Sequence, residues 1–300
     1  MSRRPRRNRP PRLDDPPPPR AAPATENGSA VAKPLTPTRR LLAGHVAGPH
    51  PELGRAEVES IVGRLTSGSP DAVLGLDLGR ISRDEAYGAL EAIWGWSGDS
   101  ARATIDPART LEAASVAAGL LAASAVPGAK VALATGRPAA LLPLYRALAG
   151  AVTEAGGELL GGDQQAVEGA SDQAMWWHDG VAVVSDGLSI LADDGLHAGP
   201  EWLFAVGRPK LVIADHGFAG AAIADGHQTI ALADLDALAL GVAARRGLPV
   251  CVVPLHDGRP PSAYEVVFEC LVPDAANTHE PHSTTPAPAA YAPTQSGGEG

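Results

Sequence analysis

The sequence predicts an α/β protein in which a parallel or mostly parallel sheet carries helices on both faces. Between residues 49 and 274, short apolar runs alternate with longer amphipathic segments. This alternation at close intervals requires parallel strands that are joined by crossover helices. Runs such as "KVALA" and "TIALA" are apolar throughout, as strands are when both faces of their sheet are covered. Aromatic residues make up only 4% of the chain, so the core must consist mainly of small aliphatic side chains.

The first half of this domain is predicted to be mostly helical. Ser82, with Glu85 three residues later, forms a capping box that begins one helix, and Asp106 followed by Pro107 begins a longer one. An apolar run that contains Asp77 indicates a buried strand. The predicted elements are a helix over residues 51–68, a strand over 71–79, and helices over 82–96 and 106–126.

The second half alternates more regularly between strands and helices. Two apolar runs within residues 172–195 are separated by "SDG", which indicates a hairpin or a strand with a turn. The other predicted elements are strand 129–138, helix 139–156, strand 157–162, helix 200–207, strand 210–215, helix 218–226, strand 228–234, helix 235–247 and strand 249–255.

Two segments outside this domain are predicted to be disordered. Residues 1–48 are rich in arginine and proline, residues 275–300 are polar and contain proline, and neither shows hydrophobic periodicity. Residues 1–40 hold ten Lys and Arg against three Asp and Glu, so the rest of the chain is strongly acidic. Nucleic-acid binding needs a basic face, so we expect no specific nucleic acid as a partner of the domain. The basic arm either solubilises the chain or touches anionic polymers or lipids nonspecifically.

The sequence predicts a cytoplasmic protein with no membrane span. It has no run of about eighteen apolar residues, which a membrane-spanning helix needs. The twin arginines near the N-terminus are not followed by the apolar segment of a secretion signal. Two cysteines, Cys251 and Cys270, are too few for a disulfide framework or a four-ligand zinc site.

Polar residues at the ends of predicted strands are the candidates for a functional site. In an open parallel sheet, ligands bind beyond the carboxyl ends of the strands, near a change in strand order. Aspartates that converge there can hold a divalent cation, whereas a single aspartate after a strand is commonly the N-cap of the next helix. The polar residues at these positions are Asp77, Thr135-Gly136-Arg137, Asp186, Asp215-His216, Asp234, Asp236 and His256-Asp257.

The acidic candidates predict a magnesium site. Asp215, with Asp234 or Asp236, would hold Mg²⁺, which prefers oxygen ligands. His216 would act as a general acid or base, since its ordinary pKa suits neutral pH. Asp77 would be a third ligand or a nucleophile. Whether Asp236 is a ligand or a helix cap is left open at this stage.

The segment after the strand "VALA" predicts a phosphate-binding turn. Arg137, together with Thr135, Gly136 and the N-terminus of the helix that follows, would bind a phosphate group, because free N–H groups and the helix dipole favour anions there. The sequence contains neither GxxxxGK[ST] nor GxGxxG, so it predicts no P-loop and no dinucleotide fingerprint.

Two segments are similar to motifs of haloacid-dehalogenase-type phosphatases. "ALATGRP" resembles their second motif, in which a Thr or Ser at a strand end holds the phosphoryl group. "VIADHGFAGAAIADGHQTIAL" resembles their fourth motif, an acidic strand end that is followed by a helix and a strand. The pair of aspartates on the first strand of that family is represented here by Asp77 alone, and the position of a further metal-holding acid is taken by Ala219.

A longer resemblance covers residues 50–272. The segments that carry it are "LGLDLG", "TIDPARTLEAA", "VALATGRPAALLPLYRALAGAVTEAGGELL", "LVIADHGFAGAA" and "VVPLHDG". They resemble an actinobacterial family whose members are described as phosphatases, which implies hydrolysis of a phosphate ester, and a small phosphorylated metabolite is the expected substrate. The incomplete acid set motivates an alternative, a non-catalytic α/β module that binds a phosphorylated or nucleotide ligand. A third possibility is an interaction protein that acts through its tails.

Overall fold

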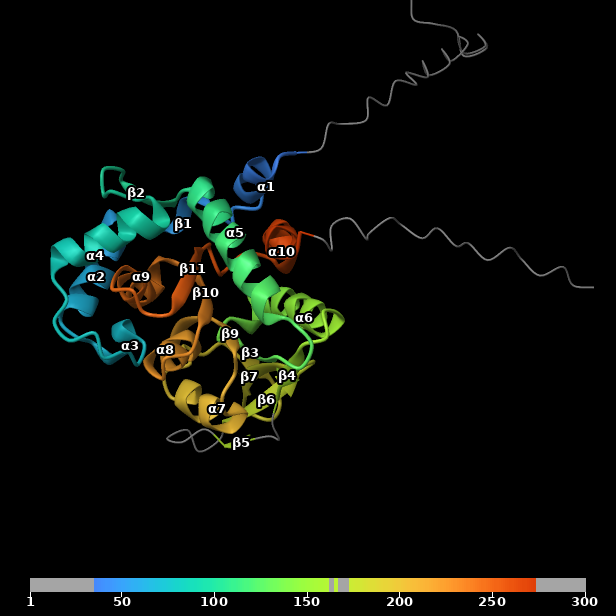
Figure 1. Cartoon of the computed structure of the whole chain (residues 1–300). Helices are drawn as coiled ribbons and strands as arrows, with labels where there is room; N and C mark the ends of the chain where they lie inside the picture. Colours follow the sequence, from blue (N-terminus) through green and yellow to red (C-terminus); the bar gives the residue numbers. More distant parts are fainter. Residues whose placement is uncertain (1–34, 162–164, 167–172, 274–300) are drawn as a thin grey trace, which may run out of the picture. The chain divides into compact units, whose positions relative to one another are not determined.

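The computed structural model describes residues 35–161, 165–166 and 173–273, which are drawn as coloured ribbon in Figure 1. The strands of its main sheet are β3 (Lys130–Ala134), β4 (Glu158–Leu160), β5 (Gln165–Ala166), β6 (Ala174–His178), β7 (Val181–Ser185), β8 (Ile190–Leu191), β9 (Leu211–Ala214), β10 (Thr229–Ala233) and β11 (Val250–Pro254). Their order is β11-β10-β9-β3-β7-β6-β5, with β4 also beside β3 and β8 also beside β7. Pairing is parallel from β11 to β7 and antiparallel among β5, β6, β7 and β8. The mostly parallel α/β fold is therefore confirmed.

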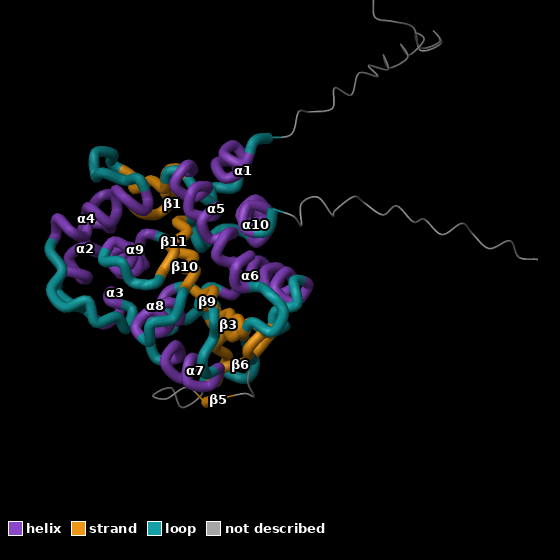
Figure 2. The backbone as a smooth tube through the Cα atoms, in the orientation of Figure 1, coloured by secondary structure: helices purple, strands orange, loops and turns teal. Residues whose placement is uncertain are grey.

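Helices cover both faces of this sheet, as Figures 1 and 2 show. One face carries α5 (Pro107–Ser124), α6 (Pro138–Glu154) and α10 (Glu265–Leu271), with α1 (Pro37–Ala43) packed on α5. The other face carries α8 (His216–Ala224) and α9 (Leu238–Arg245), with α7 (Ala198–Val206) beside α8. Outside α9 lie α2 (Arg55–Thr66), α3 (Pro70–Val73), α4 (Arg83–Ala89) and the π-helical turn η1 (Leu90–Trp94). Every residue of β7, β9 and β10 is buried, as predicted for strands that are covered on both faces.

The order of the strands changes direction between β3 and β9. From β3 the chain crosses through α6 to β4 on one side, whereas β9, β10 and β11 follow one another on the other side. Ala134 pairs with Ala214, so the residues that follow these two strands emerge next to each other at their carboxyl ends. A crevice at such a point is the usual ligand site of an open α/β sheet.

A second, two-stranded sheet extends the molecule beyond the main one. It pairs β1 (Gly48–Gly54) with β2 (Arg102–Ile105) in antiparallel register. The amide of His256 donates to the carbonyl of Val46 at 2.8 Å, which ties the segment before β1 to the end of β11. This contact brings residues from the start of the described chain to the carboxyl edge of the main sheet.

The predicted caps are present. Ser82 Oγ accepts from the amide of Glu85 at 3.1 Å and begins α4, and Asp106 accepts from the amide of Ala108 at 2.8 Å and begins α5. The hairpin predicted around "SDG" is also present, since β7 and β8 pair antiparallel across it. A second hairpin joins β6 to β7 through Asp179 and Gly180, both at positive φ.

Three predictions about the first half are wrong. Residues 71–79 form no strand, because the chain passes from the short helix α3 into an extended loop that contains Asp77. Helix α2 begins at Arg55, after β1, rather than at residue 51. Residues 35–48 are not an unstructured tail, because α1 forms there with Leu41 fully buried. The remaining predicted tail segments, 1–34 and 274–300, lie outside the described residues.

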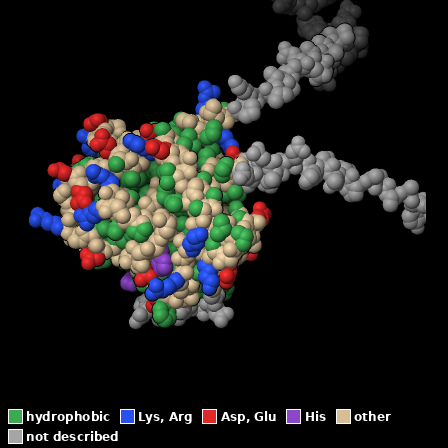
Figure 3. Space-filling view, in the orientation of Figure 1, with side chains coloured by type: hydrophobic (Ala, Val, Ile, Leu, Met, Phe, Trp, Pro, Cys, Tyr) green, Lys and Arg blue, Asp and Glu red, His purple; other side chains and the backbone are tan. Residues whose placement is uncertain are grey.

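The surface drawn in Figure 3 carries acidic and basic side chains interspersed among apolar ones. Among the described helices, none combines the length and the apolar character that crossing a membrane requires.

Candidate functional site

The candidate site lies at the carboxyl ends of four neighbouring strands of the main sheet. Thr135, Gly136 and Arg137 follow β3, Asp215 and His216 follow β9, Asp234 and Asp236 follow β10, and His256 and Asp257 follow β11. Of the predicted candidates at strand ends, the structure therefore brings together all except Asp77 and Asp186. It adds His50 of β1, which the sequence did not single out.

Asp215 joins the ends of β3 and β9. It is fully buried, and its carboxylate accepts from Thr135 Oγ1 at 2.5 Å and from the amide of Gly136 at 2.7 Å. His216 Nδ1 lies 3.4 Å from the same carboxylate. Gly136 is needed at this turn, because an added Cβ would lie 2.0 Å from the carbonyl oxygen of Asp193. Both Asp215 oxygens are thus engaged by protein donors.

We expect Asp215→Asn to lower the free energy of unfolding by about 1–3 kcal/mol, because an amide has one acceptor oxygen where the carboxylate has two. Chemical denaturation followed by circular dichroism measures this difference. Asp215→Ala should cost more, since the Gly136 amide and the Thr135 hydroxyl then lose their buried acceptor. Equal stability of the wild type and both variants would show that Asp215 does not hold the two strand ends together.

His216 begins α8 in a strained conformation. Its φ is +43°, a region that residues other than glycine rarely adopt and that is often retained at functional sites. This backbone turn directs Nε2 toward two acids, with the Asp236 carboxylate at 3.4 Å and Asp257 Oδ2 at 3.5 Å. Arg137 Nη2 lies 3.0 Å from the same nitrogen. We call His216, Asp236 and Asp257 the His216 group.

The His216 group has the geometry of an ion-binding site. Its nitrogen and two carboxylate oxygens all lie within 4.8 Å of one another. Asp236 Oδ1 and Asp257 Oδ2 are buried and accept no hydrogen bond from any described residue, although His216 Nε2 lies 3.4 Å from the first and Arg137 Nε 3.3 Å from the second. Buried polar atoms normally have such partners, so these oxygens are suited to a ligand that the protein itself does not supply. Imidazole with two carboxylates is a donor set that suits a divalent metal ion.

The acids around His216 create a negative potential. Burial lowers the pKa of His216, but Asp236 and Asp215 outweigh this effect and raise it to about 10. Burial, reinforced by Asp236 and Asp234, raises the pKa of Asp257 to about 7. Without a metal ion, the neighbouring acids repel one another, and this repulsion favours proton binding by Asp257 and His216. A bound cation would relieve the same repulsion.

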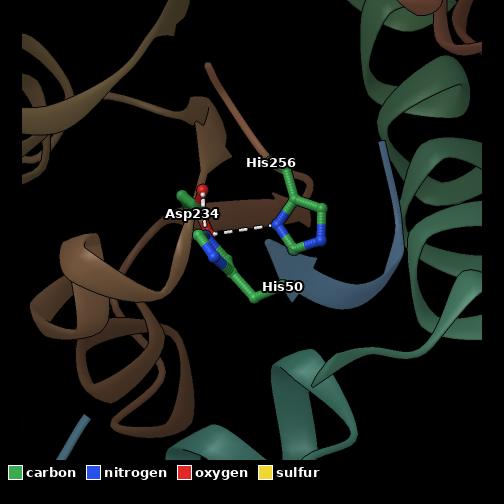
Figure 4. A group of neighbouring side chains, drawn as sticks. All are labelled: His50, Asp234 and His256. Atoms are coloured by element: carbon green, nitrogen blue, oxygen red, sulfur yellow. Dashed lines mark hydrogen bonds and ion pairs between the residues drawn. The ribbon is translucent and has the colours of Figure 1, made fainter. Parts of the chain in front are cut away.

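A second group lies beside the first and consists of His50, Asp234 and His256, drawn in Figure 4. We call it the His256 group. His50 Nε2 is 3.1 Å from Asp234 Oδ2, and His256 Nδ1 is 3.6 Å from Asp234 Oδ1. The two imidazole rings meet edge to face, with their centroids 4.4 Å apart. All three side chains are buried.

The two aspartates after β10 differ in their contacts. Asp234 is the N-cap of the 3-10 turn η2 (Leu235–Ala237), because its Oδ1 accepts from the amide of Leu235 at 2.7 Å. Asp236 lies inside this turn and points its carboxylate at His216 and Arg137. The two aspartates therefore belong to different groups.

Two candidates from the strand-end set lie away from the site. Asp77 is exposed in the loop after α3, where its carboxylate accepts from the amide of Gly79 at 3.2 Å. Asp186 is exposed in the turn between β7 and β8, where it accepts from the amides of Leu188 and Ser189. Both follow the ordinary habit of aspartate in turns.

A pocket of about 440 Å³ opens beside the site. It is lined by Arg137 and Asp257 of the site, by Arg259 of the following loop, and by small side chains, which include Ala139, Ala140, Ala192, Pro260 and Pro261. Tyr264 braces the loop, because its hydroxyl donates to the carbonyl of His256 at 2.7 Å and accepts from the amide of Arg259 at 2.9 Å. Arg259 Nε is buried with no hydrogen-bond partner.

The comparisons with known proteins agree with this geometry. A family model described as "Phosphatase" matches residues 36–279. The chain belongs to this phosphatase family. It is also similar to a protein of Streptomyces coelicolor that is named as a phosphatase, with 32% identity over 248 residues, which cover 78% of this chain and 90% of that relative. No solved structure matches the chain. The predicted membership of a phosphatase family is confirmed, and the family match includes α1, which the sequence placed outside the domain.

Proposed function

We propose that this phosphatase hydrolyses the phosphate ester of a small metabolite with the help of a divalent metal ion at the carboxyl ends of β3, β9, β10 and β11. The observation that carries this proposal is the combination of two buried carboxylate oxygens, on Asp236 and Asp257, that accept no hydrogen bond from the described residues, with a pocket that has Arg137 in its wall. These are the parts that phosphoryl transfer requires, a cation site next to an anion site.

The His216 group would hold the metal ion. An ion bound there would polarise a phosphoryl oxygen or lower the pKa of a bound water. Because one donor is an imidazole nitrogen, the group suits Mn²⁺ or another first-row ion at least as well as the Mg²⁺ that acids alone would favour. In this arrangement His216 is a ligand, and Asp215 orients it through Nδ1, as carboxylates commonly do for metal-binding histidines.

Arg137 would bind the phosphate group. Its side chain is 27% exposed and reaches from the pocket to the site, with Nε 3.3 Å from Asp257 Oδ2 and Nη2 3.4 Å from Asp236 Oδ2. A guanidinium in this position can turn two parallel N–H groups toward phosphate oxygens. Thr135 contributes indirectly, because its buried hydroxyl donates to Asp215 and accepts from the amide of Arg137 at 3.0 Å.

The pocket favours a small substrate that carries a second anionic group. Arg259 offers the pocket a second guanidinium beside that of Arg137. We expect Arg259→Gln to raise KM about tenfold or more for such a substrate, since hydrogen bonds to charged groups contribute about 1.5–3 kcal/mol. Steady-state kinetics with 3-phosphoglycerate and glycerol 3-phosphate measure this, because the carboxylate of the first has no counterpart in the second.

The matched control for Arg259 is Arg208→Gln, which changes an exposed arginine after α7. This variant should keep the KM of the wild type for both substrates. If Arg259→Gln raised KM equally for both, Arg259 would contact the reacting phosphate instead of a second group.

Phosphate release from a panel of small phosphomonoesters, measured with the purified full chain and Mn²⁺ or Mg²⁺, tests the proposed function. Turnover of at least one ester is the expected result. Thermal stabilisation by a phosphorylated compound without any turnover would instead support the alternative, a non-catalytic module that binds phosphorylated ligands.

A further inference from the structure

The His256 group contains a buried nitrogen that the protein leaves without a partner. His256 is 1% exposed, and its Nδ1 makes no hydrogen bond within the part of the chain that the structure describes. Asp234 Oδ1 lies 3.6 Å from this nitrogen. This separation is too long for a hydrogen bond. An unpaired nitrogen in a buried position calls for an explanation.

Backbone contacts fix which nitrogen of each ring carries the proton. His50 Nδ1 accepts from the amides of Glu52 and Leu53 at 3.0 and 2.9 Å, so in the neutral ring the proton is on Nε2, which donates to Asp234. His256 Nε2 faces the carbonyl of Gly48 at 3.3 Å, and a carbonyl can only accept. In a neutral His256 the lone pair is therefore on Nδ1 and faces a carboxylate oxygen.

Two lone pairs that face each other repel unless a proton or a metal ion lies between them. Ligand bonds of about 2.0–2.2 Å to nitrogen and oxygen place two ligand atoms of a tetrahedral ion roughly 3.4 Å apart, close to the separation between Asp234 and His256. The Nε2–H of His256 that points at a carbonyl is also the usual outer contact of a metal-binding histidine.

We infer that Asp234 and His256 hold a second divalent metal ion beside the one at the His216 group. The two sites adjoin, because Asp234 and Asp236 are separated by one residue, His256 and Asp257 are consecutive, and the amide of Asp257 donates to Asp234 Oδ2 at 3.4 Å. Two neighbouring ions are a common device of phosphatases, in which one stabilises the attacking oxygen and the other the leaving oxygen. The imidazole donor selects a transition ion such as Mn²⁺ or Zn²⁺ over Mg²⁺.

His50 acts in this arrangement as a positioning residue. Its Nδ1 is held by two amides of its own strand, so its Nε2 cannot offer a lone pair to a metal ion. Instead it donates to one oxygen of Asp234 and leaves the other directed at His256, as Figure 4 shows. Water or phosphate oxygens would complete the coordination of an ion that has only two protein ligands.

Counting bound Mn²⁺ tests this inference without relying on catalysis. The full chain is stripped with a chelator and titrated with Mn²⁺, while the free ion is followed by electron paramagnetic resonance. We expect two ions per chain in the wild type, and one ion in Asp234→Asn and in His256→Gln, with circular dichroism showing that each variant is folded. The matched control is His197→Gln, which changes an exposed histidine and should still bind two ions.

The inference extends the proposed function, and the two can fail separately. Two bound ions without any phosphatase activity would overturn the proposed function and leave the second site standing. One ion in the wild type, or two ions in both folded variants, would overturn the second site. In that case the neighbour of Asp234 is a protonated His256, and the proposed function rests on the His216 group alone.

Discussion

Asp257→Asn is expected to lower kcat on the order of 100-fold or more, because it removes a charged ligand from the ion that stabilises the transition state. Asp257 is 8% exposed, and its Oδ2 lies between His216 Nε2 at 3.5 Å and Arg137 Nε at 3.3 Å. The same change should leave the metal-free protein at least as stable as the wild type, since it removes one of several buried acids that lie close together. A loss of activity with gained or equal stability is typical of a residue that is kept for function.

Initial rates of phosphate release at saturating metal ion, together with thermal unfolding of the metal-free proteins, measure both effects. Asp186→Asn is the matched control, because Asp186 also follows a strand but caps an exposed turn. It should behave as the wild type in both experiments. Full activity of Asp257→Asn would remove Asp257 from the set of ligands.

Arg137→Gln is expected to reduce kcat/KM by roughly 100- to 1,000-fold, the range found when one preorganised donor to a developing negative charge is removed. Arg137 and Asp257 both belong to the site and line the pocket. Of these two, Arg137 is the one that can attract a phosphate group. It also balances Asp236 and Asp257 in the metal-free protein, so Arg137→Gln should bind the metal ion at least as tightly while turning over poorly.

Arg137→Lys separates charge from shape. Lysine keeps the positive charge but lacks the planar fork that binds two phosphate oxygens, so it should recover only part of the lost kcat/KM. Steady-state kinetics of the wild type, Arg137→Gln and Arg137→Lys on one substrate measure how much of kcat/KM the lysine recovers. If lysine restored the full rate, a single positive charge would be all that the reaction requires at this position.

The fold and most of the site could be predicted because they depend on local patterns. The apolar runs of β3, β9, β10 and β11 are continuous, and parallel pairing places their carboxyl ends at one edge of the sheet. Asp215 and His216 therefore lie beside Thr135 and Arg137, as the sequence predicts.

Asp77 shows how such a pattern misleads. Leu74, Leu76 and Leu78 are 3–6% exposed and alternate with exposed residues, which is the burial pattern of a strand. Leu74 and Gly75 have positive φ, however, and the segment runs as an extended loop without a partner strand. Alternating burial requires only an extended chain against a core, so it does not by itself place a residue at the end of a sheet strand.

His50 could not be found from the sequence, because nothing local marks it. It lies in a proline-containing segment that pairs with β2, more than fifty residues later in the chain. Its contact with Asp234 spans 184 residues. Only the tertiary fold, which ties the segment before β1 to the end of β11, shows that it belongs to the site.

The central claim is that a divalent metal ion at the carboxyl ends of the strands assists hydrolysis of a phosphate ester. The metal dependence of this hydrolysis tests the claim most directly. Phosphate release from one substrate is measured for the wild type and Asp257→Asn, first as purified, then after chelation, and then after Mn²⁺ is added back. The account predicts that chelation abolishes the activity of the wild type, that Mn²⁺ restores it, and that Asp257→Asn stays slow throughout. Hydrolysis that survives chelation unchanged, or that Asp257→Asn performs at the rate of the wild type, would contradict it.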